Sequence, residues 1–345
     1  MSGTPGGEDR RAFLKRLAGT SAMLAGLGVV GGALHDPRKG DRWFRDVAQA
    51  DAMTLPRFDV QTPVGAAKLA IVHGQAAETM VRAAIDAVGG IKAYVQPGDI
   101  VLLKPNVAFD RGPALGATTS PAVLQAVARL CREAGAKRIL VADNPINQPE
   151  GCFHKSGLGP AALAVGCELV MPGANDFETL LVGRTRTKDG KLEGQPGEAL
   201  DRWPLFATPF RQATKVIGVA PCKDHNLCGA SMSMKNWYGL LGGRRNQFHQ
   251  HIHEIISDFP LMIKPTLTVL DATRLLLRNG PTGGSLADVK PGNTIVAGAD
   301  MVAVDAYGWT LLERRGAPPA YLAKAKARGL GENDWQSLNP KELTV

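Results

Sequence analysis

The sequence lacks clustered cysteines. Its five cysteines, Cys131, Cys152, Cys167, Cys222 and Cys228, form neither a CxxC pair nor a ferredoxin run. Because iron–sulfur clusters are held by sets of cysteine thiolates at such spacings, we expect no cysteine-ligated iron–sulfur cluster. Cys131 and Cys167 fall in apolar patterns and are interpreted as small buried side chains. Cys222 and Cys228 are close in sequence, and whether they form a disulfide stays open at this point.

Two further signatures are missing. No HExxH motif is present, so a hydrolytic zinc site has no direct support. No block of Lys and Arg with interleaved aromatic residues occurs either, and we expect no nucleic-acid binding. The net charge of +8 falls to +5 beyond residue 50, where 32 basic residues face 27 acidic ones. A mild preference for small anionic ligands is what this charge indicates.

The N-terminus carries an export signature. The segment "RRAFLK", which begins at Arg10 and Arg11, resembles the twin-arginine signal, and the uncharged, glycine-rich segment 17–34 follows it. We therefore assign residues 1–50 to a signal and linker, with the twin-arginine export machinery as a partner and a periplasmic or other extracytoplasmic location. The rival interpretation is a membrane anchor formed by an uncleaved signal, since about 20 apolar residues can span a bilayer.

Beyond residue 60, short β-branched runs alternate with helical patterns. This alternation predicts a single α/β domain over residues 60–320, with a mainly parallel sheet flanked by helices. The polar, glycine-rich stretch 172–213 is predicted to be an insertion with a hairpin near Asp189 and Gly190, and residues 321–345 are predicted to be a C-terminal tail. Ser120 and Pro121 are predicted to begin a helix as N-cap and first helical residue.

Polar side chains follow four of the predicted strands. The strand ends carry Lys104 and Asn106, then Asp143 and Asn144, then Lys223, His225 and Asn226, and finally Asp271. Each could be an ordinary loop residue or helix cap. Because the carboxyl ends of parallel strands meet at one edge, however, we expect a shared site there. Lysines in such a site can fix an anion or act as bases, and His225 can carry protons.

Residues 216–241 contain the densest group of polar side chains. We predict a strand over 216–221, a turn over 222–226 and a helix that begins near Ser231 and carries Lys235 and Asn236. The first amides of that helix would face the same edge and favour an anion. Farther on, a continuous helix over 247–263 would place His249 and His253 four residues apart on one face, a spacing that suits a metal ion. Surface or core histidines are the alternative interpretation.

Several motifs in order resemble family 362 of the domains of unknown function. They are "VLLKPN" (101–106), "TTSPAVLQAVARL" (118–130), the stretch 221–241, "LTVLDAT" (267–273) and "GADMVAVDA" (298–306). Many members carry a ferredoxin-type iron–sulfur segment, which this sequence lacks, and the family is often described as redox associated. The resemblance implies that the following residues match recurrent family positions: Lys104, Asn106, Lys223, His225, Lys235, Asn236, His249 and Asp271.

The sequence therefore favours an exported enzyme that binds a small anionic substrate or cofactor at the carboxyl edge of its sheet. The expected catalytic residues are Lys104, Lys223, His225 and His249. The residues expected to bind the substrate or cofactor are Asn106, Ser231, Lys235, Asn236 and Asp271, and a metal ion would be held by His249 and His253. One alternative is a non-catalytic partner or maturation factor of an exported redox complex, and another is an iron–sulfur electron-transfer protein.

Overall fold

The computed structural model describes Lys15, residues 52–314 and residues 316–345. The predicted export signal and linker therefore lie outside the described residues, apart from Lys15. Residues 53–345 form one compact unit, and the fold reported below is the fold of that unit. Within the described part of the chain, no helix combines the length and the apolar character needed to cross a membrane.

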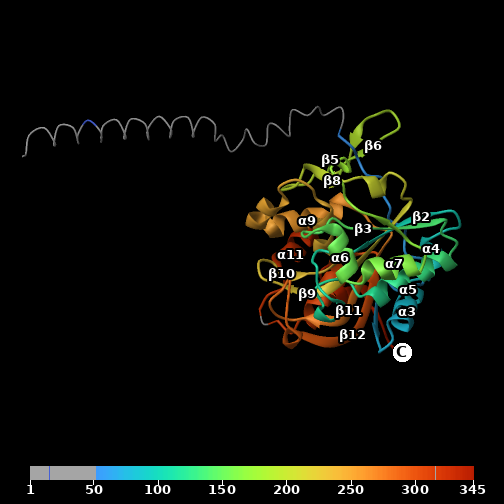
Figure 1. The fold of residues 1–345 in the computed structure, drawn as a ribbon. Helices are drawn as coiled ribbons and strands as arrows, with labels where there is room; N and C mark the ends of the chain where they lie inside the picture. The colour runs from blue at the N-terminus through green and yellow to red at the C-terminus, as the bar shows by residue number, and fades with distance from the viewer. Residues whose placement is uncertain (1–14, 16–51, 315) are drawn as a thin grey trace, which may run out of the picture. The chain divides into compact units, whose positions relative to one another are not determined.

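The described residues build an α/β fold around a nine-stranded, mostly parallel sheet, which confirms the predicted fold class (Figure 1). The strands lie in the order β13-β1-β12-β11-β9-β2-β3-β4, and β10 pairs with β9 alone. Strands β11, β9, β2, β3 and β4 run parallel, whereas β12 is antiparallel to both of its neighbours. The strand bounds are β1 Leu69–His73, β2 Ile100–Pro105, β3 Arg138–Ala142, β4 Glu168–Val170, β9 Lys215–His225, β10 Gly229–Ser231, β11 Leu267–Leu276, β12 Val289–Gly298 and β13 Lys341–Thr344.

Helices cover both faces of the sheet because its central strands are apolar on both sides. In β2, Leu103 packs into the core that includes α3 and α5, and its neighbour Leu102 packs into the core that includes Trp237 and α9. Figure 1 shows α9 and α11 on one side and α3 and α5 on the other. The first face carries α3 Ala77–Ala87, α4 Ile91–Tyr94, α5 Pro121–Glu133, α6 Pro149–Lys155 and α7 Leu158–Ala164, and the second carries α8 Ser233–Asn236, α9 Ile252–Met262, α10 Met301–Leu311 and α11 Ala320–Ala327.

The polar insertion is a small β excursion, as predicted. Strand β5 (Phe177–Leu181) pairs antiparallel with β8 (Arg202–Phe206), and β6 (Thr185–Arg186) pairs with β7 (Leu192–Glu193). The second pair is the expected hairpin. Gly190 in its turn has a φ of 84°, a left-handed conformation that glycine adopts without strain.

The predicted turn over 222–226 is wrong, because β9 continues through Pro221 to His225. Pairing with β2 ends at Val219, and β10 takes over as the antiparallel partner from Lys223 to His225. Proline lacks a backbone N–H, so Pro221 removes only one hydrogen-bond donor from β9. It can therefore lie where the pairing partner of β9 changes from β2 to β10. Lys223 and His225 therefore lie on a hairpin that extends beyond the end of β2.

Two predicted helices are also shorter than expected. The segment after Ser231 forms α8 over only four residues, followed by the 3₁₀ helix η3 (Trp237–Leu240), and Ser231 itself belongs to β10. The segment 247–263 is divided between the 3₁₀ helix η4 (Arg245–His251) and α9, so it is not one continuous α-helix. Ser120 precedes α5 and Pro121 begins it, but the Ser120 side chain makes no capping bond.

The C-terminal residues are more than the predicted tail. They contribute α11, the 3₁₀ helix η6 (Trp335–Leu338) and β13, which pairs parallel with β1. Tyr321 and Leu322 of α11 are buried against the core, so apolar packing fixes this segment.

We expect Gly218→Ala to destabilise the sheet, because a Cβ at Gly218 would lie 2.9 Å from Cζ2 of the buried Trp237. Overpacking of this kind costs about 1–3 kcal/mol, which urea unfolding can measure. Gly112→Ala is the matched control, because nothing lies within 4 Å of its added Cβ and its φ is −65°. The control should change the free energy of unfolding by less than about 0.5 kcal/mol. Equal effects of the two substitutions would contradict this packing.

Candidate functional site

A cavity of about 80 Å³ lies where the parallel strands end. The ends of β2, β3 and β9 reach it, and so do β10, α8 and η4. Nine of the residues predicted from sequence line it: Asn106, Asp143, Asn144, Lys223, His225, Ser231, Lys235, Asn236 and His249. A cavity of this volume holds a ligand of roughly five to eight heavy atoms, if each takes the space of one water-sized sphere.

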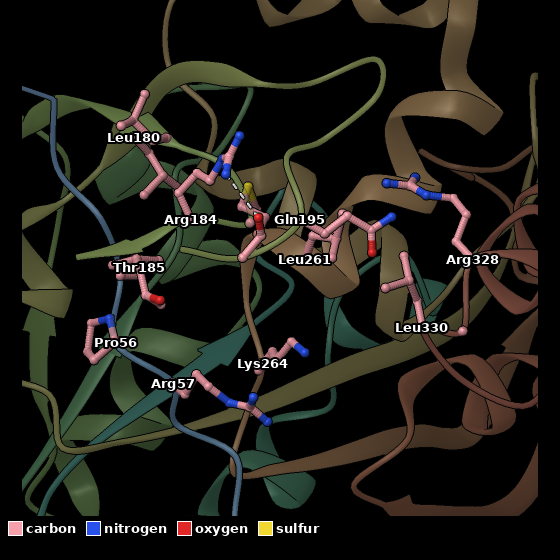
Figure 2. A pocket seen from close by; sticks show the side chains of 16 residues that line it. Pro56, Arg57, Leu180, Arg184, Thr185, Gln195, Leu261, Lys264, Arg328 and Leu330 are labelled. Carbon is pink, nitrogen blue, oxygen red and sulfur yellow. Dashed lines mark hydrogen bonds between the residues drawn. The ribbon is translucent and has the colours of Figure 1, made fainter. Parts of the chain in front are cut away.

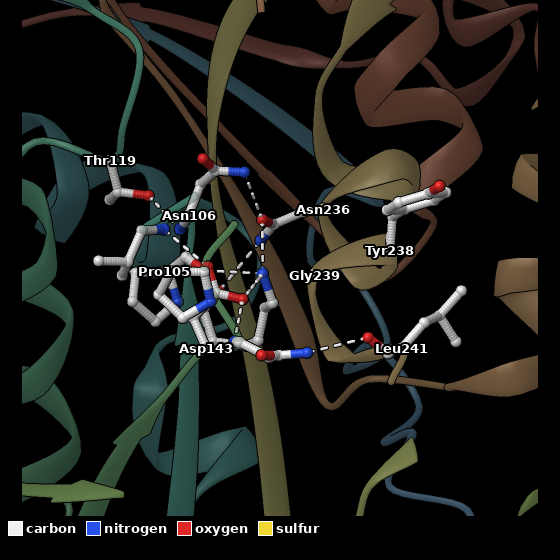
Figure 3. Close-up of polar contacts among 12 residues, drawn as sticks. Pro105, Asn106, Thr119, Asp143, Asn236, Tyr238, Gly239 and Leu241 are labelled. Atoms are coloured by element: carbon white, nitrogen blue, oxygen red, sulfur yellow. Dashed lines mark hydrogen bonds and ion pairs between the residues drawn. The ribbon is translucent and has the colours of Figure 1, made fainter. Parts of the chain in front are cut away.

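Lys104 lies behind this cavity and is fully buried. Its ammonium nitrogen lies 2.8 Å from Asp143 Oδ1, 2.8 Å from Asn236 Oδ1 and 2.9 Å from the Pro105 carbonyl oxygen. Figure 3 shows these three partners. Three acceptors use all three N–H donors of an ammonium group. Burial lowers the pKa of Lys104, and the Asp143 carboxylate opposes that shift. Lys104 therefore holds the site together and has no free donor for a ligand.

Asp143 and Asn236 extend this contact into a network. Asp143 Oδ2 accepts a hydrogen bond from the Val107 amide at 2.7 Å, and the Asn236 amide group donates to the Lys104 carbonyl oxygen at 3.1 Å. Asn236 Oδ1 also accepts from Asn106 at 3.1 Å. Gly239 packs over the ion pair, and a Cβ there would lie 2.9 Å from Lys104 Nζ and closer still to Asp143. The network thus joins the ends of β2 and β3 to α8.

Lys223 reaches the cavity from β9. Its ammonium nitrogen donates to Asn106 Oδ1 at 3.2 Å and to the Ala117 carbonyl oxygen, and it lies 5.1 Å from the centre of the Phe109 ring. Both acceptors are neutral. Burial, followed by repulsion from Lys235 and Lys104, lowers the pKa of Lys223 to about 7. A lysine with such a pKa can gain or lose a proton near neutral pH, as a general acid or base must.

Lys235 and Arg245 add positive charge without a carboxylate partner. The Lys235 ammonium lies 4.5 Å from the centre of the Tyr238 ring and makes no hydrogen bond or ion pair within the described part of the chain. Burial lowers the pKa of Lys235. Arg245 donates to backbone carbonyl oxygens, among them those of Gly239 and Asn144, each at 2.8 Å. The guanidinium is fixed in place, and its charge remains uncompensated.

His225 is a neutral hydrogen-bond donor. Its Nδ1 accepts from the Leu227 amide at 3.2 Å, so the proton of the neutral ring lies on Nε2. Burial, followed by repulsion from Lys235 and Lys223, lowers the pKa of His225 to about 2. The His249 ring stacks on it with a centroid distance of 6.3 Å. Nδ1 of His249 lies 2.8 Å from the Asn246 carbonyl oxygen, which assigns its proton to Nδ1 and leaves Nε2 as an acceptor.

These contacts give the cavity an excess of buried positive charge. Lys104, Lys223, Lys235 and Arg245 face one carboxylate, Asp143, and Lys104 already pairs with it. Buried charges without a counter-charge are energetically costly, and an anion offsets that cost. The arrangement can therefore hold a small anion and exchange a proton with it through Lys223.

Two more predicted residues, besides Lys104, lie apart from the cavity lining. The Asp271 carboxylate accepts hydrogen bonds from the Ser120 amide at 2.6 Å and from the Thr273 hydroxyl at 2.6 Å. It thus fixes the start of α5. His253 stacks on Tyr321 with a centroid distance of 6.0 Å, whereas His249 faces the cavity. Among the described residues, no group of three or more His, Cys, Asp or Glu side chains is arranged to hold a metal ion.

The predicted helix amides do not face an incoming anion. The amides of Ser233 and Met234 donate to the two oxygens of the Asp305 carboxylate at 2.7 and 2.9 Å. Asp305 thus already occupies both amides at the start of α8. The prediction that the first amides of this helix bind an anion is therefore wrong.

Cys222 and Cys228 are free thiols in this structure. Cys222 Sγ contacts the Gly308 carbonyl oxygen at 3.4 Å, and Cys228 Sγ contacts the Ala230 carbonyl oxygen at 3.2 Å. The two side chains belong to different apolar clusters, and therefore they do not form the disulfide that the sequence left open.

Sequence reasoning missed Tyr238, Arg245 and the role of Asp143. Tyr238 and Arg245 follow directly after Lys235 and Asn236, so the run "KNWYGLLGGRR" was the available signal. Asp143 was placed at the strand edge, but nothing in the sequence identifies Lys104 as its partner. That pairing depends on the adjacency of β2 and β3.

We expect Lys104→Met to lower the free energy of unfolding by about 3–5 kcal/mol, because it leaves Asp143 buried without its partner. The double variant Lys104→Met/Asp143→Asn should recover part of that loss, which urea unfolding can measure. Arg129→Met is the control, since its ion pair with Glu78 is exposed and should be worth less than about 1 kcal/mol. A double variant less stable than the single one would refute the role of the ion pair.

Residues 101–310 match the family described as Domain of unknown function (DUF362). The chain is also similar to the thylakoid-associated protein sll1697 of Synechocystis sp., with 25% identity over 276 residues, 76% of this chain and 80% of that protein. The region of the family match contains Lys104 and every residue that lines the strand-edge cavity. Since this match covers more than half of the chain, the protein belongs to the DUF362 family.

Proposed function

We propose that this protein is an enzyme that binds a small anionic substrate or cofactor in the strand-edge cavity. The observation that supports the proposal is the set of three cations, Lys223, Lys235 and Arg245, that line the cavity without a carboxylate partner. Their burial makes the electrostatic attraction for an anion stronger than it would be at an exposed surface.

The side chains suggest separate roles in such an enzyme. Lys235 and the Nε2–H group of His225 would bind the anion directly, and Arg245 would act through its charge because carbonyl oxygens already engage its N–H groups. Lys223 would transfer a proton, with the free Nε2 of His249 as a second acceptor. Asn106 and Ser231 would orient the ligand from the cavity wall.

The cavity volume of about 80 Å³ limits the ligand to a small molecule. Typical sites for drug-sized ligands have volumes of about 300–1,000 Å³, so a substrate of that size would need the site to open. A small carboxylate or an inorganic oxyanion fits the charge and the volume together.

We expect calorimetry to detect saturable binding of at least one of acetate, oxalate and inorganic phosphate to the purified protein. Lys235→Met should weaken that binding about ten-fold or more, because it removes a cation that makes no hydrogen bond or ion pair in the described structure. Lys137→Met is the matched control, since Lys137 is exposed and lies outside the cavity lining. Equal weakening by the two variants would reject the proposed site.

The same binding should weaken as the pH rises through about 7. Lys223 carries its charge below that pH and loses it above, so the attraction for the anion declines toward higher pH. In Lys223→Met this part of the pH dependence should disappear. An affinity that stays constant between pH 6 and about 8.5 in the unmodified protein would contradict the assigned role of Lys223.

We also propose export by the twin-arginine route, on the basis of the "RRAFLK" segment. The double substitution Arg10→Lys/Arg11→Lys should retain most of the protein in the cytoplasm, as cell fractionation and immunoblotting can show. Arg38→Lys is the control, because it lies outside the motif and keeps its charge. Unchanged export of the double variant would exclude this route. An association with an exported redox complex and a metal ion held by His249 and His253 stay predictions.

A further inference from the structure

A second cavity, of about 250 Å³, lies beside the β excursion. Four cationic side chains from separate segments line it: Arg57, Arg184, Lys264 and Arg328. Figure 2 shows them around the space, with Leu261 and Leu330 between them and Leu180 beside Arg184. No Asp or Glu is among the lining residues within the described part of the chain, and this cavity shares no lining residue with the strand-edge cavity.

Neighbouring carboxylates offset the positive charge of only some of these four side chains. Arg57 pairs with Asp59 at 2.5 Å, and Arg328 pairs with Asp258 at 2.6 Å and Glu198 at 3.2 Å.

Two of the four cations make no ion pair with a carboxylate among the described residues, although Lys264 is close enough to Asp59 to help lower the pKa of that carboxyl. Nη1 of Arg184 donates to the Gly194 carbonyl oxygen at 3.0 Å. The Lys264 ammonium makes no hydrogen bond or ion pair among the residues that the structure describes. Their charges therefore remain available to a ligand.

Arg328 adds an unsatisfied donor. Its side chain is only 10% exposed, and its Nη2 atom is buried without a hydrogen-bond partner in the described structure. Buried polar groups are normally hydrogen-bonded, and a buried N–H group without a partner marks a place where an acceptor is missing. Arg328 lines the cavity, and a ligand oxygen there becomes this acceptor when the guanidinium turns toward the space.

We propose that this second cavity binds a phosphate monoester. Guanidinium groups match the oxygens of a phosphate in pairs, and Lys264 adds a point charge for the dianion. The cavity also has room beyond a phosphate group, since about 250 Å³ corresponds to roughly 20 water-sized spheres. A phosphorylated small molecule of the size of a pentose phosphate fits both the charge and the volume.

Calorimetric titration with ribose 5-phosphate tests this proposal, with ribose as the uncharged control. We expect a Kd at or below about 1 mM for the phosphate ester and no detectable binding of ribose. Arg184→Gln/Lys264→Gln should weaken the binding about ten-fold or more, because it removes the two cations that make no ion pair with a carboxylate among the described residues. Lys188→Gln, an exposed substitution in the same excursion, should change it less than about two-fold.

Two further measurements distinguish binding in this cavity from binding at the strand edge and from a loss of folding. Lys235→Met should leave ribose 5-phosphate binding unchanged, because Lys235 lies in the other cavity. Thermal unfolding of the double variant should match the unmodified protein, which shows that any loss of binding is local. Absence of saturable binding, equal loss in Lys188→Gln, or tighter binding of citrate than of ribose 5-phosphate would overturn the proposal.

Discussion

The buried ion pair between Lys104 and Asp143 is the contact on which the geometry of the strand-edge site depends. It joins the ends of two adjacent parallel strands, and Asn236 brings α8 to the same point. The position of α8 in turn sets the positions of Lys235 and of Tyr238 in the next turn. Gly239 leaves the space that the pair needs. A side chain at that position would displace either the pair or the helix.

The same ion pair explains the electrostatics of the cavity. Asp143 is the carboxylate that lines the cavity, and it is already bound to Lys104. The remaining lysines and Arg245 therefore have neutral partners such as carbonyl oxygens, amide oxygens and aromatic rings. Burying charge in this way lowers the free energy of unfolding of the protein. Such unfavourable burial is typical of residues that act on a ligand. The lowered pKa of Lys223, at about 7, is a direct consequence.

The sequence predicted the fold and the grouping of polar strand ends because both depend on local patterns. Alternating apolar runs indicate a parallel sheet, and parallel strands bring residues such as Asn106 and Lys223 to one edge. The continuation of β9 past Pro221 could not be predicted, because it depends on pairing with β10. The same holds for Asp305, which is distant in sequence from the amides it binds, and for Asp271, whose partner is the start of α5. In each of these examples, contacts between segments that are distant in sequence determine the observed structure.

Nuclear magnetic resonance of the protein labelled with ¹³C-lysine tests most directly whether the strand-edge cavity holds buried lysines without a counter-charge, because it follows the side-chain titration of each lysine. We predict that one lysine signal titrates with a pKa of about 7. This signal should be missing in Lys223→Met, and its pKa should rise when an anion binds in the cavity. Titration of every lysine near its ordinary pKa of about 10.4, with and without the anion, would contradict the account.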